Sequence, residues 1–178
     1  MKTIKTALPY LIGGALFLCA VRTNAQMSVG RVVQYAIEKK VAVDAPLDRV
    51  WDSLSNLITL PRYASGYFTA VAREGKTSVY DFTMKDGSVV KGGMDYLDPR
   101  SDDRFCTITL TAPFPEGIQH IEWLLTVKEA PDGNGTIVRW AAVIDGSDDA
   151  RERVKQQLAG MFDDYFKGLA GIFQVKQA

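Results

Sequence analysis

The last part of the chain has the pattern of one long amphipathic helix, and this element strongly constrains the fold. Apolar side chains recur there at a helical period, at Val154, Leu158, Met161, Phe162, Tyr165, Leu169, Ile172 and Phe173. Asp149 and Glu152 have the spacing of a capped helix start. A helix of about 25 residues rises about 1.5 Å per residue, so it is long enough to cross a whole small sheet. We therefore expect its apolar face to pack against such a sheet.

Strand-like segments precede this helix, because apolar and polar residues alternate between short turns. Six segments show this pattern, at residues 67–73, 77–84, 89–97, 104–112, 118–129 and 136–145. Asp86-Gly87 is a strong two-residue hairpin signal, and residues 130–135 (APDGNG) are rich in turn formers. Short connections of this kind predict an antiparallel meander. Gly92 and Gly93 lie inside a strand, where glycine often marks a bulge or a sharp bend.

A further strand-like segment, residues 33–43, runs through Asp44-Ala45-Pro46 directly into a short helix. Pro46 has a fixed φ that suits a first helical turn, and Asp48 places negative charge near the helix start. One apolar helical face follows, made of Val50, Trp51, Leu54 and Leu57. Residues 58–65 (ITLPRYAS) predict a second short helix or a turn near Pro61.

One strand, two short helices, six strands and a long helix form a specific order. The chain resembles the START-type helix-grip superfamily (SRPBCC), in particular the polyketide cyclase/dehydrase and lipid transport family. Three stretches carry the likeness, namely Val43–Leu54, Gly133–Trp140 and Tyr165–Leu169, within residues 33–174. The resemblance implies an α+β helix-grip fold, in which a seven-stranded curved antiparallel sheet wraps round the C-terminal helix and leaves an apolar cavity. It implies no shared catalytic residues, since these motifs are structural positions.

The first 25 residues have the layout of a secretory signal peptide. Lys2 and Lys5 precede an apolar run at residues 7–21, and small or polar residues follow up to Ala25. The run is short for a membrane span, which needs about 20 apolar residues. We therefore expect cleavage after Ala25, a single domain over residues 26–178 with no stable membrane span, and a periplasmic or secreted bacterial location. An uncleaved N-terminal anchor is the alternative.

Composition narrows the classes of partner. The chain without residues 1–25 keeps 18 Lys and Arg against 21 Asp and Glu, and no basic block stands out, which argues against nucleic acid. It keeps one cysteine, Cys106, which lies in a strand pattern and predicts a buried, inert thiol. With one histidine and no clustered ligand spacing, we expect no metal and no cofactor.

Strand alternation and the apolar helical face together predict which residues line the cavity. These are Tyr80, Phe82, Met84, Met94, Tyr96, Trp123, Leu125, Val138, Trp140, Met161, Phe162 and Tyr165. Any one of them could instead be packed core, but a strongly bent sheet cannot close tightly on one helix. The helix glycines Gly160, Gly168 and Gly171 would leave further room. Tyrosine hydroxyls and tryptophan N–H groups could orient a ligand. His120 and Glu122 lie on the other strand parity from Trp123 and predict a solvated pair.

The main hypothesis is an exported, non-enzymatic carrier or binder of a small hydrophobic or lipid-like molecule, held between the sheet and the C-terminal helix. The loop at residues 112–117 (APFPEG) and the region at residues 58–65 are its plausible gates. One alternative is a polyketide cyclase/dehydratase-type enzyme, for which Tyr80, Tyr96 and Tyr165 are the acid/base candidates. Another is an envelope interaction module whose cavity is vestigial.

Overall fold

The structure, a computed structural model, describes residues 34–100 and 103–176. The elements follow the predicted order, with one short strand added at the end. They are β1 (Ile37–Val43), α1 (Leu47–Leu54), the 3-10 helix η1 (Leu57–Arg62), β2 (Phe68–Arg73), β3 (Val79–Met84), β4 (Val89–Asp98), β5 (Asp103–Leu110), β6 (Ile118–Glu129), β7 (Thr136–Gly146), α2 (Asp148–Ala170) and β8 (Val175–Lys176).

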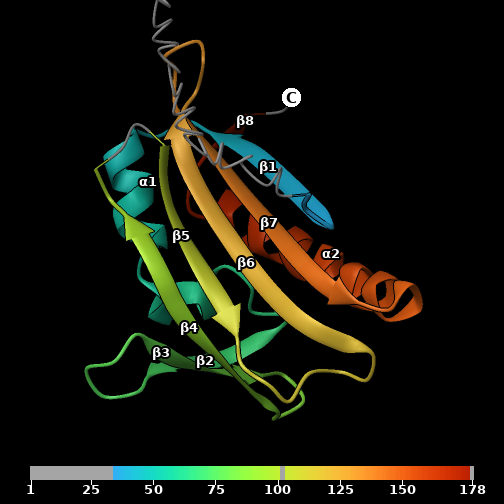
Figure 1. Ribbon diagram of the computed structural model, residues 1–178. Coiled ribbons are helices and arrows are strands. Elements are labelled where there is room, and N and C mark those ends of the chain that lie inside the picture. Colours follow the sequence, from blue (N-terminus) through green and yellow to red (C-terminus); the bar gives the residue numbers. More distant parts are fainter. Residues whose placement is uncertain (1–33, 101–102, 177–178) are drawn as a thin grey trace, which may run out of the picture. The chain divides into compact units, whose positions relative to one another are not determined.

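The strands form one antiparallel sheet in the order β2-β3-β4-β5-β6-β7-β1-β8 (Figure 1). Strands β2 to β7 pair with their neighbours in sequence, which confirms the predicted meander. Strand β1 pairs with β7 and therefore brings the first strand beside the last long one. The two-residue β8 pairs with β1 and was not predicted. Apart from this addition, the sheet confirms the helix-grip fold.

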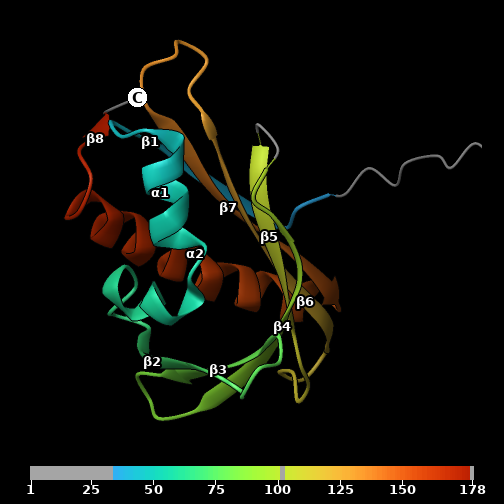
Figure 2. The ribbon, with the colours of Figure 1, turned by 90° about the vertical axis from the view of Figure 1, so that its left-hand side faces the viewer.

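Helix α2 lies across the concave side of the sheet, with α1 and η1 at one end of that space (Figure 2). The side chains that α2 buries repeat at the predicted helical period, at Ala150, Val154, Leu158, Met161, Phe162, Tyr165 and Leu169. The predicted helix cap is wrong by two residues, because the N-cap is Ser147 rather than Asp149 and α2 begins at Asp148. Its N-cap residue, Ser147, makes no side-chain capping hydrogen bond.

The joint between β1 and α1 is held by the start of β7. The Thr136 hydroxyl is buried and donates a hydrogen bond to the Ala45 carbonyl over 2.7 Å. Gly135 has φ +102°, and a Cβ added to it would lie 2.3 Å from the Val43 carbonyl oxygen, so only glycine fits there. Two of the stretches that carry the family resemblance therefore meet in space. Their residues maintain this junction, and Trp51, only 4% exposed, anchors α1 in the core.

Strand β4 contains a bulge that changes its alternation. Met94 pairs with Ile108, but Tyr96 pairs with Thr107, so one extra residue lies between the two positions. Thr107 is on the opposite parity of β5 from Ile108. Regular alternation, which the grouping of Tyr96 with Met94 assumed, is therefore interrupted between these two positions of the backbone.

Gly92 has a different role from the predicted one. The bulge lies beyond it, and Gly92 keeps its place in the ladder opposite Tyr80 and Leu110. A Cβ added at Gly92 would lie 3.1 Å from side-chain atoms of Phe82, Ile108 and Leu110. The missing side chain therefore gives these neighbours room on the concave face.

Candidate ligand-binding site

Most residues predicted to line a cavity lie together between the sheet and α2. Nine of them are buried, with at most 8% of each residue exposed: Tyr80, Phe82, Trp123, Leu125, Val138, Trp140, Met161, Phe162 and Tyr165. Met84 and Met94 are half-buried and pack against the same cluster. The structure does not describe the side chain of Tyr96. The structure thus gathers eleven of the predicted residues in one core region, which we call the concave face.

Aromatic rings run through the concave face in mutual contact. The Trp140 ring lies 5.7 Å from Phe162 in a stacked arrangement and 5.4 Å from Tyr165 edge-on, measured between ring centroids. The Trp123 ring lies 6.4 Å from Trp140 and 5.6 Å from Phe82, both edge-on. These separations are those of favourable aromatic pairs. The rings therefore form a continuous aromatic layer from β3 across to α2.

Two polar atoms in this layer have no hydrogen-bond partner. The indole nitrogens of Trp123 and Trp140 are both buried, on residues that are 4% and 2% exposed. An indole N–H is a donor only, so it needs an acceptor. Leaving such a donor buried and unpaired costs about 1–3 kcal/mol. The concave face is therefore apolar with two unpaired donors.

Burial holds two ionisable groups of the concave face, Cys106 and Tyr165, in their neutral form. Burial raises the pKa of the Cys106 thiol to about 12, which agrees with the predicted inert, buried thiol. Burial also raises the pKa of Tyr165 far above its ordinary value of 10.0, and the neighbouring Trp140 indole offsets only part of this rise. That indole lies beside the Tyr165 ring but does not reach hydrogen-bond geometry. Neither group exchanges a proton near neutral pH.

His120 and Glu122 lie on the outward side of β6, as their parity predicted. The His120 ring nitrogen is 3.9 Å from the Glu122 carboxylate, and each side chain is about a third exposed. Trp123, by contrast, is buried on the concave face. Within residues 34–100 and 103–176, no three His, Cys, Asp or Glu residues are grouped so that they could hold a metal ion. Acid/base or metal chemistry therefore finds no support in this pair.

The glycines of α2 do not leave the room that the sequence indicated. A Cβ added at Gly168 would lie 2.1 Å from the Tyr63 carbonyl oxygen. One added at Gly160 would lie 2.2 Å from the Tyr67 hydroxyl. Both glycines are instead required because the segment between η1 and β2 approaches the helix closely. The interpretation of these two positions as spare volume is therefore wrong.

We call residues 63–67 the strap, since they tie η1 and β2 to α2. The Gly66 N–H donates a hydrogen bond to Asp164, with a nitrogen–oxygen distance of 2.7 Å. Asp164 lies between the two glycines at intervals of four residues, so all three share one side of the helix. The Tyr63 ring also lies 5.5 Å from Tyr165. The strap is thereby joined to one end of the aromatic layer.

Both predicted gate regions lie beside α2. In the loop between β5 and β6, Phe114 is half-buried against the core, and the Gly117 carbonyl accepts a hydrogen bond from the Ser147 N–H over 2.9 Å. At the other region, Ile58 is 50% exposed in η1, which leads into the strap. Both regions are therefore held close to α2, the second through Tyr63 beside Gly168.

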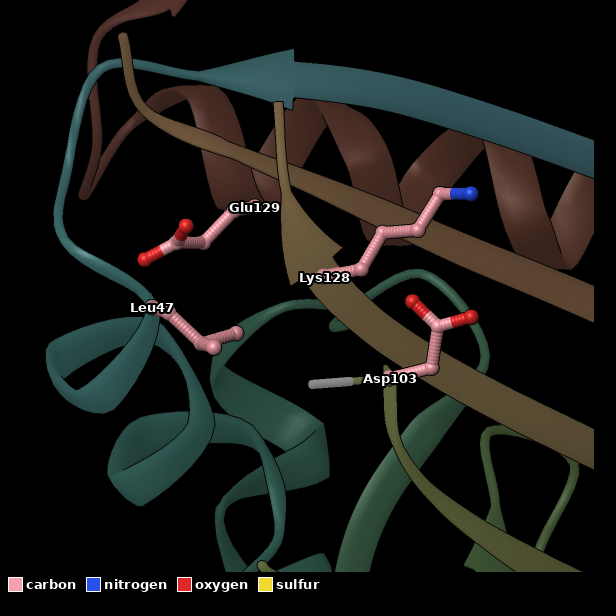
Figure 3. A pocket seen from close by; sticks show the side chains of 4 residues that line it. All are labelled: Leu47, Asp103, Lys128 and Glu129. Atoms are coloured by element: carbon pink, nitrogen blue, oxygen red, sulfur yellow. The ribbon is translucent and has the colours of Figure 1, made fainter. Parts of the chain in front are cut away.

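A surface pocket lies where the start of α1 meets the ends of β5 and β6 (Figure 3). It encloses about 200 Å³ and is lined by Leu47, Asp103, Lys128 and Glu129. Figure 3 shows the Lys128 ammonium directed away from the Glu129 carboxylate. Pockets for small molecules are typically larger, at about 300–1,000 Å³, and mostly apolar. This pocket is therefore smaller and more polar than a typical small-molecule site.

The curved sheet, the long helix and the apolar layer between them define a helix-grip protein of the SRPBCC type. The family model described as polyketide cyclase / dehydrase and lipid transport matches residues 34–173. The chain belongs to that family. No curated protein matches it. Among the described residues, none forms a helix long and apolar enough to cross a membrane.

Solved structures from several organisms share the fold. The protein XoxI from Bacillus cereus is 18% identical, with a TM-score of 0.67, over 77% of this chain and 94% of its own. A protein from Thermobifida fusca is 21% identical, with a TM-score of 0.63, over 75% and 89%. Truncated norcoclaurine synthase from Thalictrum flavum is 17% identical, with a TM-score of 0.55, over 72% and 89%. At these identities the likeness shows the fold alone.

Proposed function

We propose that this protein is an exported, non-enzymatic carrier that binds a small hydrophobic or lipid-like molecule between the sheet and α2. The observation that carries the proposal is the buried aromatic layer with two unpaired indole donors, at Trp123 and Trp140. Apolar contact would supply affinity at about 25 cal/mol per Å² of buried surface, and the donors would orient the ligand. The family description, which includes lipid transport, supports the same function.

The alternative is a cyclase-type enzyme, which the family description also includes. The solved structures of norcoclaurine synthase, an enzyme by its name, share the fold and keep this alternative open. General acid/base catalysis works best when the pKa lies near the operating pH. Tyr165 and Cys106 have raised pKa values, and no charged side chain is among the described buried residues. These features favour binding over turnover, and an interaction module with a vestigial cavity is the third possibility.

Native mass spectrometry of the full chain, purified from its own host, tests the carrier proposal. We expect a mass above that of the chain alone and an apolar molecule in the solvent extract. Met94→Trp should reduce the amount of ligand bound, because it places a larger side chain at a half-buried position of the concave face. Thr107→Trp, on the outward parity of the neighbouring strand β5, is the matched control. A solvent extract without any apolar molecule, together with an interior that contains no cavity, would overturn the proposal.

Export is a separate part of the proposal and rests on residues 1–25, which lie outside the described structure. N-terminal sequencing of the protein recovered from a bacterial periplasmic or culture fraction should begin at Gln26. A chain that keeps residues 1–25 and stays with the membrane fraction would establish the anchor instead.

A further inference from the structure

We infer that the ligand of the concave face is a neutral molecule that has an apolar body and a hydrogen-bond acceptor oxygen, such as a ketone, ester or ether. The acceptor would receive the indole N–H of Trp123, with Trp140 as a second donor. This inference rests on the proposed function, because it names the class of ligand that the same face would hold.

The two indoles differ from the other unpaired buried atoms. Those atoms belong to Asp81, Arg104 and Arg139. Each of these three side chains has an ion-pair partner on another element of the fold, so its charge is compensated. An indole has only one polar atom, and in Trp123 and Trp140 that atom is unpaired. The hydrogen-bonding capacity of Trp123 is therefore wholly available to a bound molecule, whereas the Trp140 indole also has the Tyr165 hydroxyl beside it.

Within residues 34–100 and 103–176, the indole N–H of Trp123 reaches no hydrogen-bond acceptor. Among the described residues, the rings of Phe68, Phe82 and Trp140 contact the Trp123 ring, and none of these three rings carries an oxygen. Trp140 has the Tyr165 hydroxyl beside it, although without hydrogen-bond geometry. A ligand oxygen would thus accept a hydrogen bond from the Trp123 indole N–H. It could also accept one from the Trp140 indole N–H, which has no well-aligned partner. A pure hydrocarbon would leave both donors unpaired.

The charges around the concave face favour a neutral ligand. No charged side chain is among the buried residues of the described part. Two cations that border the face already have partners: Lys39 pairs with Asp163 of α2, and Arg104 pairs with Asp48 of α1. A carboxylate placed among the rings would be buried with no counter-ion, which is strongly unfavourable. An uncharged oxygen avoids this cost and still accepts the indole N–H.

Three matched probes test the inference with the delipidated full chain: hexyl methyl ketone, octane and octanoate. NMR of the indole N–H groups reports on binding, and the third tryptophan, Trp51 in α1, serves as an internal reference. We expect the ketone to bind about tenfold more tightly than octane, as one added hydrogen bond predicts. The ketone should shift the Trp123 and Trp140 signals and leave that of Trp51 unchanged. Octanoate should bind more weakly than the ketone.

Phenylalanine variants separate the hydrogen bond from the packing. Trp123→Phe should weaken ketone binding about tenfold and leave octane binding unchanged. Because Trp123→Phe also shortens a buried ring, a moderate loss of urea resistance in the unliganded protein is expected, and Trp51→Phe, at an equally buried position, shows how much of any effect comes from lost packing. Trp51→Phe is the control and should change neither affinity.

Two outcomes would overturn the inference while the proposed function stands: equal affinity for ketone and octane, or tighter binding of octanoate than of the ketone. Trp123→Phe weakening both neutral probes equally would also overturn it, because the indole would then act only through its bulk. If none of the three probes binds, the proposed function fails as well.

Discussion

Helix α2 packs against the sheet with large side chains and against the strap with glycines. Toward the sheet it presents large residues, such as Phe162 and Tyr165, which fill the concave face. Toward the strap it presents Gly160 and Gly168, where the neighbouring segment comes so close that a Cβ would clash. The sheet contact therefore depends on volume and the strap contact on the absence of volume. Substitutions on the sheet side should therefore destabilise the protein by removing volume, and substitutions on the strap side by adding it.

The largest effect is expected on the sheet side, from Phe162→Ala. Phe162 is 1% exposed and stacks on Trp140, so truncation removes buried surface and leaves a cavity. We expect a loss of about 4 kcal/mol in the free energy of unfolding, measured by urea titration. Ile172→Ala is the control, since Ile172 is 48% exposed, and it should change the stability little. A small effect of Phe162→Ala would mean that this side of α2 is not packed as described.

On the strap side, Gly168→Ala should lower the free energy of unfolding by about 3 kcal/mol, because the new methyl group meets backbone that cannot easily move. Its Cβ would lie 2.1 Å from the Tyr63 carbonyl oxygen and 2.7 Å from the Tyr63 Cα. Gly171→Ala is the matched control, since its nearest contact there is 3.3 Å away. The same urea titration decides, and equal stability of the two variants would contradict the close approach.

Gly160→Ala should cost less, about 2 kcal/mol, because its contact is the end of a side chain. The added Cβ would lie 2.2 Å from the Tyr67 hydroxyl but 3.4 Å from the ring carbon that carries it. Tyr67→Phe should therefore restore most of the stability lost in Gly160→Ala. A double-mutant cycle measures this coupling, and additive effects would show that the two residues do not meet.

The smallest effect is a pH dependence on the sheet side. The Cys106 thiol ionises at about its ordinary pKa of 9.0 when unfolded, but burial raises its pKa to about 12 in the fold. The unfolded state then loses its proton first, so stability falls as the pH rises from 9.0 toward 12. At one pH unit above 9.0 the loss is about 1.4 kcal/mol. Cys106→Ala should flatten the stability profile by that amount, and an unchanged profile would indicate a hydrated thiol.

Much of the fold could be predicted because its signals are local. Alternation and turn residues placed β6 at residues 118–129, where the structure has it, and Asp86-Gly87 marked the turn between β3 and β4. The helical period gave the buried side of α2 and, with strand parity, brought Trp123 and Trp140 onto one face. These patterns depend only on neighbours in the chain, so the sequence alone reveals them.

The remaining features depend on contacts between distant residues. The α2 glycines were interpreted as spare room, since nothing near Gly168 in the sequence shows that Tyr63 approaches it. Gly92 and Gly93 pointed to a bulge or bend in β4 but not to its place, which lies between Met94 and Tyr96. Strand β8 has two residues, too few for any period. That the Trp123 indole lacks a partner could be learned only from its packed surroundings.

The central claim is that a ligand lies between the sheet and α2, and a crystal structure of the protein with its co-purified ligand tests it most directly. We predict density for an apolar molecule among the rings of the concave face, with an acceptor oxygen within hydrogen-bond distance of the Trp123 indole nitrogen. The claim would be contradicted if the ring contacts were unchanged from those described and the ligand lay instead in the surface pocket, which is lined by Leu47, Asp103, Lys128 and Glu129.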